Sequence, residues 1–351
     1  MNEHVSVLAE PKNQPSSWFR VILALVVVAE AVAVFFGLRD LMEPGTVAAG
    51  AIPIVTAIVV AGAFYIMWDH MCRTIPAFRS PGRRVAGIAL GSILMLVTIA
   101  ASSWFIAAAI GGNAATRVHE DAFVTQVQTE LEKAQANTKA EKAIYTKVLE
   151  IEAAWRGETK REARFGTQSG KQGDGPVTML YANAADSLVK LAKVLDAKNT
   201  ESETVQKKTL DLIKDMKQAR TQQEFVQKAT DASSLLARLD GITGVQEAQN
   251  FGVVAIDTKL GDLKVQVDAL TDELRRTAKG VEEKRKKVDA PFYAPTTGAV
   301  AIIEYPSASP GAWIVGVAID VVPFLVLLLL VLCHAEAREH RSNVVALQAA
   351  E

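Results

Sequence analysis

Apolar residues are gathered into four blocks along this chain rather than spread through it. The blocks cover residues 18–38, 46–68, 85–110 and 313–333. A helix of about 20 residues crosses a hydrocarbon core of about 30 Å, because each residue adds about 1.5 Å to its length. The pattern therefore predicts four transmembrane helices.

The third block continues, without a proline, into a polar helical pattern that extends to Trp155. Apolar residues recur there every three or four positions, slip once and then resume: Val124, Val127, Leu131 and Ala134, then Ile144, Val148, Ile151 and Trp155. Such a slip resembles a stutter within one long helix. We therefore expect a membrane helix that continues as a stalk.

The region between the third and fourth blocks is predicted to be almost entirely helical. Its cleanest apolar repeat lies near its end and alternates steps of three and four, which is typical of a coiled coil. The predicted seam consists of Leu260, Leu263, Val267, Leu270 and Leu274. We expect this seam to pack against the helix that carries Ile144.

Several local signals predict where helices begin and end in this region. Residues 166–175 are glycine-rich and predict a flexible connector, and Pro176 is well placed as the first residue of the next helix. Capping boxes at Thr200 and Thr221 each mark a possible helix start. The last helix is expected to end at Asp289, before a proline-rich stretch.

The arginines predict the orientation in the membrane. Short loops rich in Lys and Arg stay on the cytoplasmic side. Arg39 is the one arginine between the first two blocks, whereas four follow the second block: Arg73, Arg79, Arg83 and Arg84. Both termini are then cytoplasmic, and the long insertion lies outside the cytoplasm. The expected location is the cell inner membrane.

The predicted fold is an all-α membrane protein with four transmembrane helices and a long extracytoplasmic helical coiled-coil stalk. The expected layout follows the chain: a cytoplasmic tail (1–17), transmembrane helices one to three (18–110), the extracytoplasmic domain (111–310), transmembrane helix four (311–333) and a second cytoplasmic tail (334–351). Residues 291–310 carry four prolines and are expected to form an extended collar over the membrane surface.

Composition narrows the function classes. The chain is 50% hydrophobic with a formal net charge of −1, and no basic patch is interleaved with aromatic residues, so nucleic acid is not an expected partner. The two cysteines, Cys72 and Cys333, both lie outside the long insertion. No disulfide framework can hold that insertion together, so helix packing must do so.

Two acids, Glu30 and Asp320, lie inside predicted spans. A carboxylate at mid-span costs about 2.5–3.5 kcal/mol on insertion scales, so each acid requires a reason. One reading is a proton or ion relay that is aided by hydroxyls on the third span: Thr98, Ser102 and Ser103. The other reading, which we favour, is that the acids are protonated or hydrogen-bonded between helices and pin the bundle. No basic residue lies at mid-span to partner them.

No residues suggest an enzyme. The five histidines do not follow a metal-ligand spacing, and no nucleophile can be matched with a base. The glycine-rich connector lacks the Lys-Ser/Thr ending of a phosphate-binding loop. We therefore expect no catalytic, cofactor-binding or metal site.

Three short features carry a resemblance. They are the Trp68-Asp69 exit from the second block with arginines after it, the basic start of the third block, and the sequence Asp320-Val321-Val322-Pro323. In these features the chain resembles an uncharacterised family of bacterial four-span membrane proteins with a coiled-coil insertion between spans three and four. The resemblance implies a layout and no activity.

The expected function is that of a membrane scaffold or adaptor. Its stalk would assemble with partners, which are a further copy of the chain or other envelope proteins, and its spans would contact the lipid bilayer. The alternative is an ion- or proton-coupled channel or transport component that uses Glu30 and Asp320. A sensor is a third possibility, but no cytoplasmic signalling domain is present to receive its signal.

Overall fold

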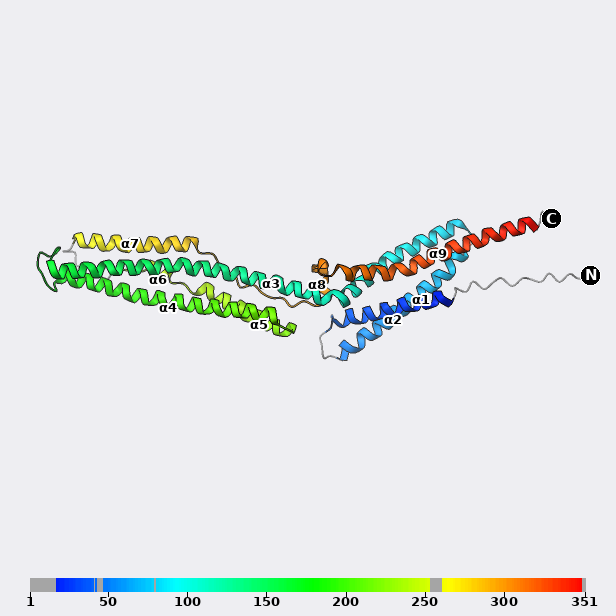
Figure 1. Cartoon of the computed structure of the whole chain (residues 1–351), viewed down its shortest axis with the longest axis horizontal. Helices are drawn as coiled ribbons and strands as arrows, with labels where there is room; N and C mark the ends of the chain where they lie inside the picture. Colours follow the sequence, from blue (N-terminus) through cyan, green and yellow to red (C-terminus); the bar gives the residue numbers. More distant parts are fainter. Residues whose placement is uncertain (1–16, 41, 43–46, 79, 253–260, 349–351) are drawn as a thin grey trace, which may run out of the picture. The chain divides into compact units, whose positions relative to one another are not determined.

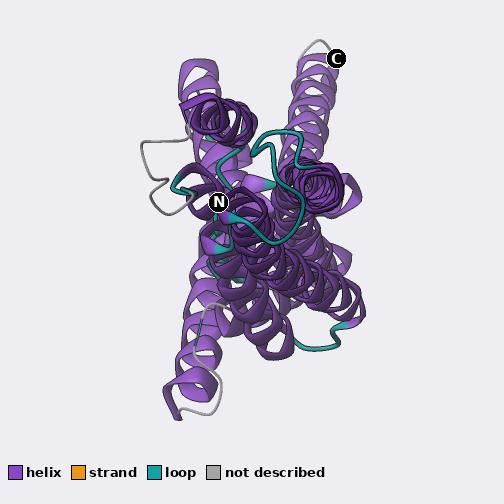
Figure 2. Ribbon diagram, turned by 90° about the vertical axis from the view of Figure 1, so that its left-hand side faces the viewer, coloured by secondary structure: helices purple, strands orange, loops and turns teal. Residues whose placement is uncertain are grey.

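The computed structural model describes residues 17–40, 42, 47–78, 80–252 and 261–348. Within these ranges every regular element is a helix, and no strand occurs (Figure 2). The chain divides into two compact units. Unit 1 comprises residues 1–120 and 296–351, and unit 2 comprises residues 121–295.

Unit 1 contains the apolar helices. Its elements are α1 (Ser17–Asp40), α2 (Val47–Ala77), the first part of α3 (Pro81–Phe165), α8 (Gly298–Glu304), the 3-10 helix η1 (Pro306–Ala308) and α9 (Pro310–Gln348) (Figure 1). Four of these helices, α1, α2, α3 and α9, are long and apolar enough to cross a membrane. The prediction of four such helices is confirmed.

The apolar helices of unit 1 expose many large hydrophobic side chains. One face of α1 is buried in the unit, including Leu23 and Val34, while Leu25 and Val28 on the other face are exposed. The core that α2 and α9 share is built around fully buried Trp68 and Leu327. A surface of this kind is unfavourable in water and suits an apolar solvent.

Unit 2 is a bundle of long helices. After the second part of α3 come α4 (Pro176–Gln218), α5 (Gln222–Gly241), α6 (Val245–Gln249) and α7 (Gly261–Lys284). Helices α3, α4 and α7 run side by side (Figure 1). α3 passes through the slip in its apolar pattern without a break, as the pattern predicted.

Two hydrophobic clusters hold unit 2 together. The first joins α3, α4, α6 and α7 through residues that include Ile144, Trp155, Leu188, Val245 and Leu274. The second joins α3, α4 and α5 to the segment after α7, through residues that include Leu131, Ile213, Phe225, Leu236 and Tyr293. On α3 the two clusters are separated by the residues of the slip.

Local signals at helix starts were right in two places and wrong in one. Pro176 begins α4, and Thr221 caps α5 by accepting a hydrogen bond from the backbone N–H of Glu224 at 3.2 Å. The predicted start at Thr200 is wrong, because α4 continues through it to Gln218. Ser202 and Val205 are buried there and keep the same face of α4 against the bundle.

The end of α7 and the proline-rich stretch also differ from expectation. α7 ends at Lys284 rather than at Asp289, and the backbone after it is extended. Of residues 291–310, Tyr293 is buried in the second cluster of unit 2, while α8 and η1 in unit 1 interrupt the expected extended run.

Candidate functional site

The polar residues predicted inside the spans are largely buried in unit 1. Glu30 is 2% exposed and lies on the inward face of α1. Ser102 and Ser103 are buried on α3, and Thr98, one turn earlier, is half-buried. The structure describes the backbone of Asp320 within α9, whereas its side chain lies outside the described atoms.

Close contacts fix how α1 lies along α3. A Cβ atom at Gly37 would lie 2.8 Å from Phe105 Cδ1. At the end of α1, Phe36 and Arg39 line a cavity together with four residues of α3: Ala108, Ala109, Gly112 and Asn113. Residue numbers rise together along the two helices, so they are parallel. This register places Glu30 level with residues 98–103 of α3.

A second set of contacts fixes α9 against α3. A Cβ atom at Gly316 would lie 2.8 Å from Ser103 Cα, and one at Gly91 would lie 3.5 Å from Leu327 Cδ2. Numbers fall on α9 as they rise on α3, so these helices are antiparallel. Asp320 is then level with Thr98. The polar residues that the sequence singled out on three separate helices therefore share one level of unit 1.

The hydroxyls of this level bond mainly to their own helix. Ser102 Oγ donates to the carbonyl of Thr98 at 2.8 Å, and Thr98 Oγ1 donates to the carbonyl of Leu94. Such bonds one turn back are a common way to satisfy a hydroxyl in an apolar surrounding. Ser103 Oγ is buried and makes no hydrogen bond to a described atom. The level thus combines one buried carboxyl group with three hydroxyls.

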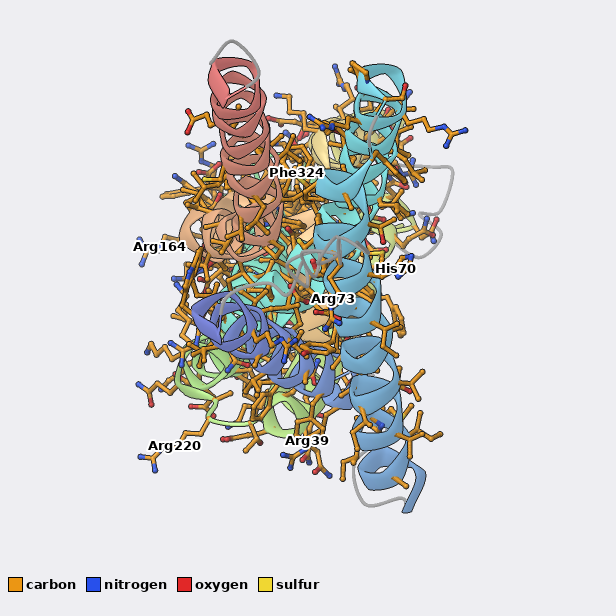
Figure 3. The ribbon with its side chains drawn as sticks, turned by 90° about the vertical axis from the view of Figure 1, so that its right-hand side faces the viewer. Arg39, His70, Arg73, Arg164, Arg220 and Phe324 are labelled. Carbon is orange, nitrogen blue, oxygen red and sulfur yellow. The ribbon has the colours of Figure 1, made fainter. Side chains whose placement is uncertain are left out.

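The arginines predicted to set the topology lie near the end of α2 and the start of α3. Arg73 lies on α2 (Figure 3) and pairs with Asp69 at 2.7 Å, and Arg84 Nε donates to the carbonyl of Phe78 at 2.7 Å. Arg83 is exposed, and Arg79 lies outside the described residues. Because α2 continues to Ala77 and α3 begins at Pro81, much of the predicted loop is helical.

In unit 2, buried polar residues of α3 lie within the slip of the apolar pattern, at Asn137 and Glu141, and just before it, at Glu130. Asn137 is held by two hydrogen bonds to the backbone of Lys286, one donated by Asn137 Nδ2 at 2.7 Å and one accepted by its Oδ1 at 2.9 Å. Glu130 accepts from the N–H of Asp289 at 2.9 Å, and Glu141 accepts from the N–H of Gly244 at 3.1 Å. We call these three residues of α3 the polar clasp.

The polar clasp explains why α7 stops early. The N–H groups of Lys286 and Asp289 bond to side chains of α3 instead of to helical carbonyls. The backbone of Val288 is held in the same way, because its N–H donates to Asp240 Oδ1 at 3.2 Å. Sequence reasoning missed the clasp, although its residues keep the three-and-four spacing through the slip.

The predicted coiled-coil seam lies in the first cluster of unit 2. Val267 and Leu274 are each 1% exposed, and Leu270 is half-buried against the same cluster. They meet side chains of both α3 and α4, so the seam faces two helices. Leu260 lies outside the described residues, as does the side chain of Leu263.

The glycine-rich connector is folded around Glu162. The carboxylate, 1% exposed, accepts hydrogen bonds from the N–H groups of Gln168 and Ser169, both at 2.8 Å, and from the hydroxyl of Thr167 at 3.0 Å. Burial by itself would raise the pKa of Glu162, but these hydrogen bonds outweigh it and lower the pKa to about 2. Gly166 has φ +58, which favours glycine.

Within the described ranges, no group of three His, Cys, Asp or Glu side chains is placed to hold a metal ion.

His119 Nδ1 lies 3.4 Å from the Tyr305 hydroxyl and 3.7 Å from a carboxylate oxygen of Glu304. This contact fastens the C-terminal end of α8 to α3 within unit 1.

Comparison with known proteins gives no match to a family model, to a curated protein or to a solved structure. The resemblance to four-span bacterial membrane proteins stays a prediction.

Proposed function

We propose that this chain is a multi-pass membrane protein whose unit 2 serves as an extracytoplasmic scaffold or adaptor. The observation that carries the proposal is the joining of four apolar helices to a long, laterally packed helical unit. From residue 121 to residue 165, α3 alone would extend about 66 Å at about 1.5 Å per residue. A helical unit of that length offers an extended surface to partners.

The surface of unit 1 supports membrane insertion. Large apolar side chains are exposed along α1, α2, α3 and α9, where contact with water would be unfavourable and contact with lipid would not. The arginines Arg73, Arg83 and Arg84 gather where α2 gives way to α3, which favours a cytoplasmic position for that end. Both termini would then be cytoplasmic, with unit 2 in the periplasm or on the outer surface.

Labelling of introduced cysteines tests this topology. Native Cys72 is 4% exposed, so its failure to react would carry no information. In a Cys72→Ala, Cys333→Ala background, a membrane-impermeant thiol reagent on intact cells should label Ser169→Cys and not Ser80→Cys. Both positions are exposed, so the two variants are matched. If Ser80→Cys alone is labelled, the chain has the opposite orientation to the one we propose.

The construction of unit 2 supports a scaffold. Two apolar clusters and the polar clasp fix its helices against one another, while ion pairs such as Lys142–Glu203 lie on its outer surface. The partners we propose are a second copy of the chain or other envelope proteins.

Native mass measurement with cross-linking tests the scaffold role. Photoreactive residues at Leu149 and Val194, which are 40% and 43% exposed on unit 2, should capture one defined partner chain in intact membranes. The extracted complex should have a mass above that of one chain and contain the same partner. A mass of 37.7 kDa with no cross-link at either position would contradict the scaffold.

A second candidate function is an ion- or proton-coupled channel or transport component. The observation that favours it is the common level of Glu30, Thr98 and Asp320, since a relay needs its polar groups close together. As a relay, Asp320 must change its protonation state, which Asn cannot do. As a pin, Asp320 need only share a hydrogen bond, and Asn can replace it.

Substitution at Asp320 separates the two functions. For the scaffold, Asp320→Asn should assemble normally and keep activity, while Asp320→Leu should loosen the assembly. Proteoliposomes that contain the chain should show no proton flux above protein-free vesicles. A normally assembled but inactive Asp320→Asn chain, with flux lost relative to the unsubstituted chain, would favour transport.

A further inference from the structure

We propose that Arg39 and Asn113 bind the phosphate group of an anionic phospholipid in the outer leaflet, with an acyl chain lying along α1. The inference rests on the proposed membrane placement of unit 1. Its evidence is a cavity between α1 and α3, an exposed apolar stripe that leads to it, and the set of polar groups around it.

The stripe lies on the outward face of α1. Its side chains recur at steps of three and four, so they share one face of the helix, and each is between 48% and 66% exposed: Val21, Leu25, Val28, Val32 and Phe36. Arg39 is exposed and continues the same spacing one step beyond Phe36. A lipid chain along this stripe would bring its headgroup to Arg39.

The cavity measures about 260 Å³ and is lined by Phe36, Arg39, Ala108, Ala109, Gly112 and Asn113. It arises because Gly37 brings α1 against Phe105, after which the small side chains of α3 leave room between the two helices. Pockets for drug-sized ligands measure about 300–1,000 Å³. The space therefore suits a headgroup better than a larger molecule.

The lining matches a phosphate chemically. A guanidinium offers forked N–H donors that fit phosphate oxygens, and the Asn113 amide adds a further donor. None of the six lining residues is a carboxylate, so no charge in the lining repels an anion. Phe36 and Ala109 supply apolar surface for the glycerol backbone below it.

The position along the helices matches the depth of a headgroup. The apolar block of α3 ends at Ile110, and Gly112 and Asn113 are the first residues beyond it to line the cavity. Arg39 lies in the last turn of α1, where the helix dipole favours a cation. Both helices thus reach the boundary between apolar and polar surroundings at the cavity.

Titration of the purified full chain with phosphatidylglycerol, followed by native mass spectrometry, tests the site. The unsubstituted chain should retain one lipid more tightly than the rest. Arg39→Gln should raise the Kd for that lipid about tenfold through loss of a charge-assisted hydrogen bond. Ala109→Trp should raise it similarly by filling the cavity while Arg39 remains.

Arg20→Gln is the matched control. Arg20 is an exposed arginine at the opposite end of α1, and its substitution should leave retention of the tight lipid unchanged. Equal losses in Arg20→Gln and Arg39→Gln, or no loss in Arg39→Gln and Ala109→Trp, would overturn the site.

Two further arms identify the ligand. Phosphatidylcholine should bind more weakly than phosphatidylglycerol, and millimolar inorganic phosphate should not displace the lipid. Displacement by inorganic phosphate would overturn the lipid assignment in favour of a plain anion site. Cysteine labelling of the Arg39→Gln chain at positions 169 and 80 tests the membrane placement separately. Labelling at position 80 alone would show that the site is not in the outer leaflet, and it would not alter lipid retention.

Discussion

The two parts of α3 belong to one helix but expose different kinds of side chain. Between residues 85 and 110 its exposed side chains are apolar, including Leu90, Ile93 and Val97. Between residues 121 and 165 the exposed positions are mostly polar or charged, among them Arg161. The buried face keeps the same spacing of three and four in both parts. The inward spacing therefore reflects packing, whereas the outward composition suits an apolar solvent in the first part and water in the second.

The units also differ in how their helices approach one another. In unit 1, helices come into close contact at glycines, as at Gly37 and Gly316, where any side chain would meet the neighbouring helix. In unit 2, side chains of α3 reach across to the backbone of other segments, as Asn137 does to Lys286. Apolar surroundings reward close backbone contact. In water, a buried polar group must find a partner, and this requirement selects one arrangement.

The largest expected effect comes from the apolar cluster of unit 2. Leu274→Ala should lower the free energy of unfolding by about 2–5 kcal/mol, because the side chain is fully buried between α3 and α4. Denaturant titration of the full chain in detergent, followed by tryptophan fluorescence, measures it. Val265→Ala, at 66% exposure on the same helix, should change stability by less than about 0.5 kcal/mol. Equal effects of the two would contradict the assigned packing.

The polar clasp should come next. Asn137→Ala removes both hydrogen bonds to Lys286 and should cost about 2–3 kcal/mol in the same titration. It should also expose the segment after α7 to proteases, because the clasp is what holds that backbone extended. Asn183→Ala, at an exposed position of α4, is the control and should be neutral. If proteases leave the segment after α7 uncut in Asn137→Ala, the clasp does not anchor that segment.

Glycine substitution sharpens the contrast in unit 1. Gly316→Ala places a methyl group against Cα and Cβ of Ser103, so α3 and α9 must separate, at a cost of about 1–2 kcal/mol. Gly62→Ala on α2 meets no atom within 4 Å and should be neutral or slightly stabilising. Thermal unfolding of both variants in one detergent makes the comparison. A more stable Gly316→Ala chain would show that the helices are not in close contact.

The smallest effect is local and depends on pH. The pKa of Glu162 is lowered from its ordinary 4.5 to about 2 in the folded chain. Its contribution to stability is therefore complete above about pH 4.5 and is lost as the pH falls toward 2. The protection factors of the Gln168 and Ser169 amides, which are exchange rates corrected for the intrinsic slowing of exchange in acid, should fall in that window. Glu162→Gln should exchange faster at neutral pH, and identical exchange in the two chains would contradict the role of the carboxylate.

Features set by nearby residues could be predicted from the sequence. The four apolar helices, the continuity of α3 and the cap at Thr221 each depend on residues a few positions apart. The polar clasp could not be predicted, because Asn137 and its partner Lys286 lie 149 residues apart. The residues around either one give no sign that the two are in contact. The shared level of Glu30 and Asp320 depends on the contacts of Gly37 and Gly316, which set how the helices slide along one another.

The distance between the clasp and its partner in the sequence has a consequence for synthesis. Ribosomes extend chains at about 5–20 residues per second, so roughly 7–30 seconds separate the appearance of Asn137 from that of Lys286. Throughout that interval the inward polar face of α3 has neither its backbone partners nor the side chains of α7. Unit 2 can therefore reach its final packing only after the segment that follows α7 has been synthesised, and until then this face of α3 is open to proteases and chaperones.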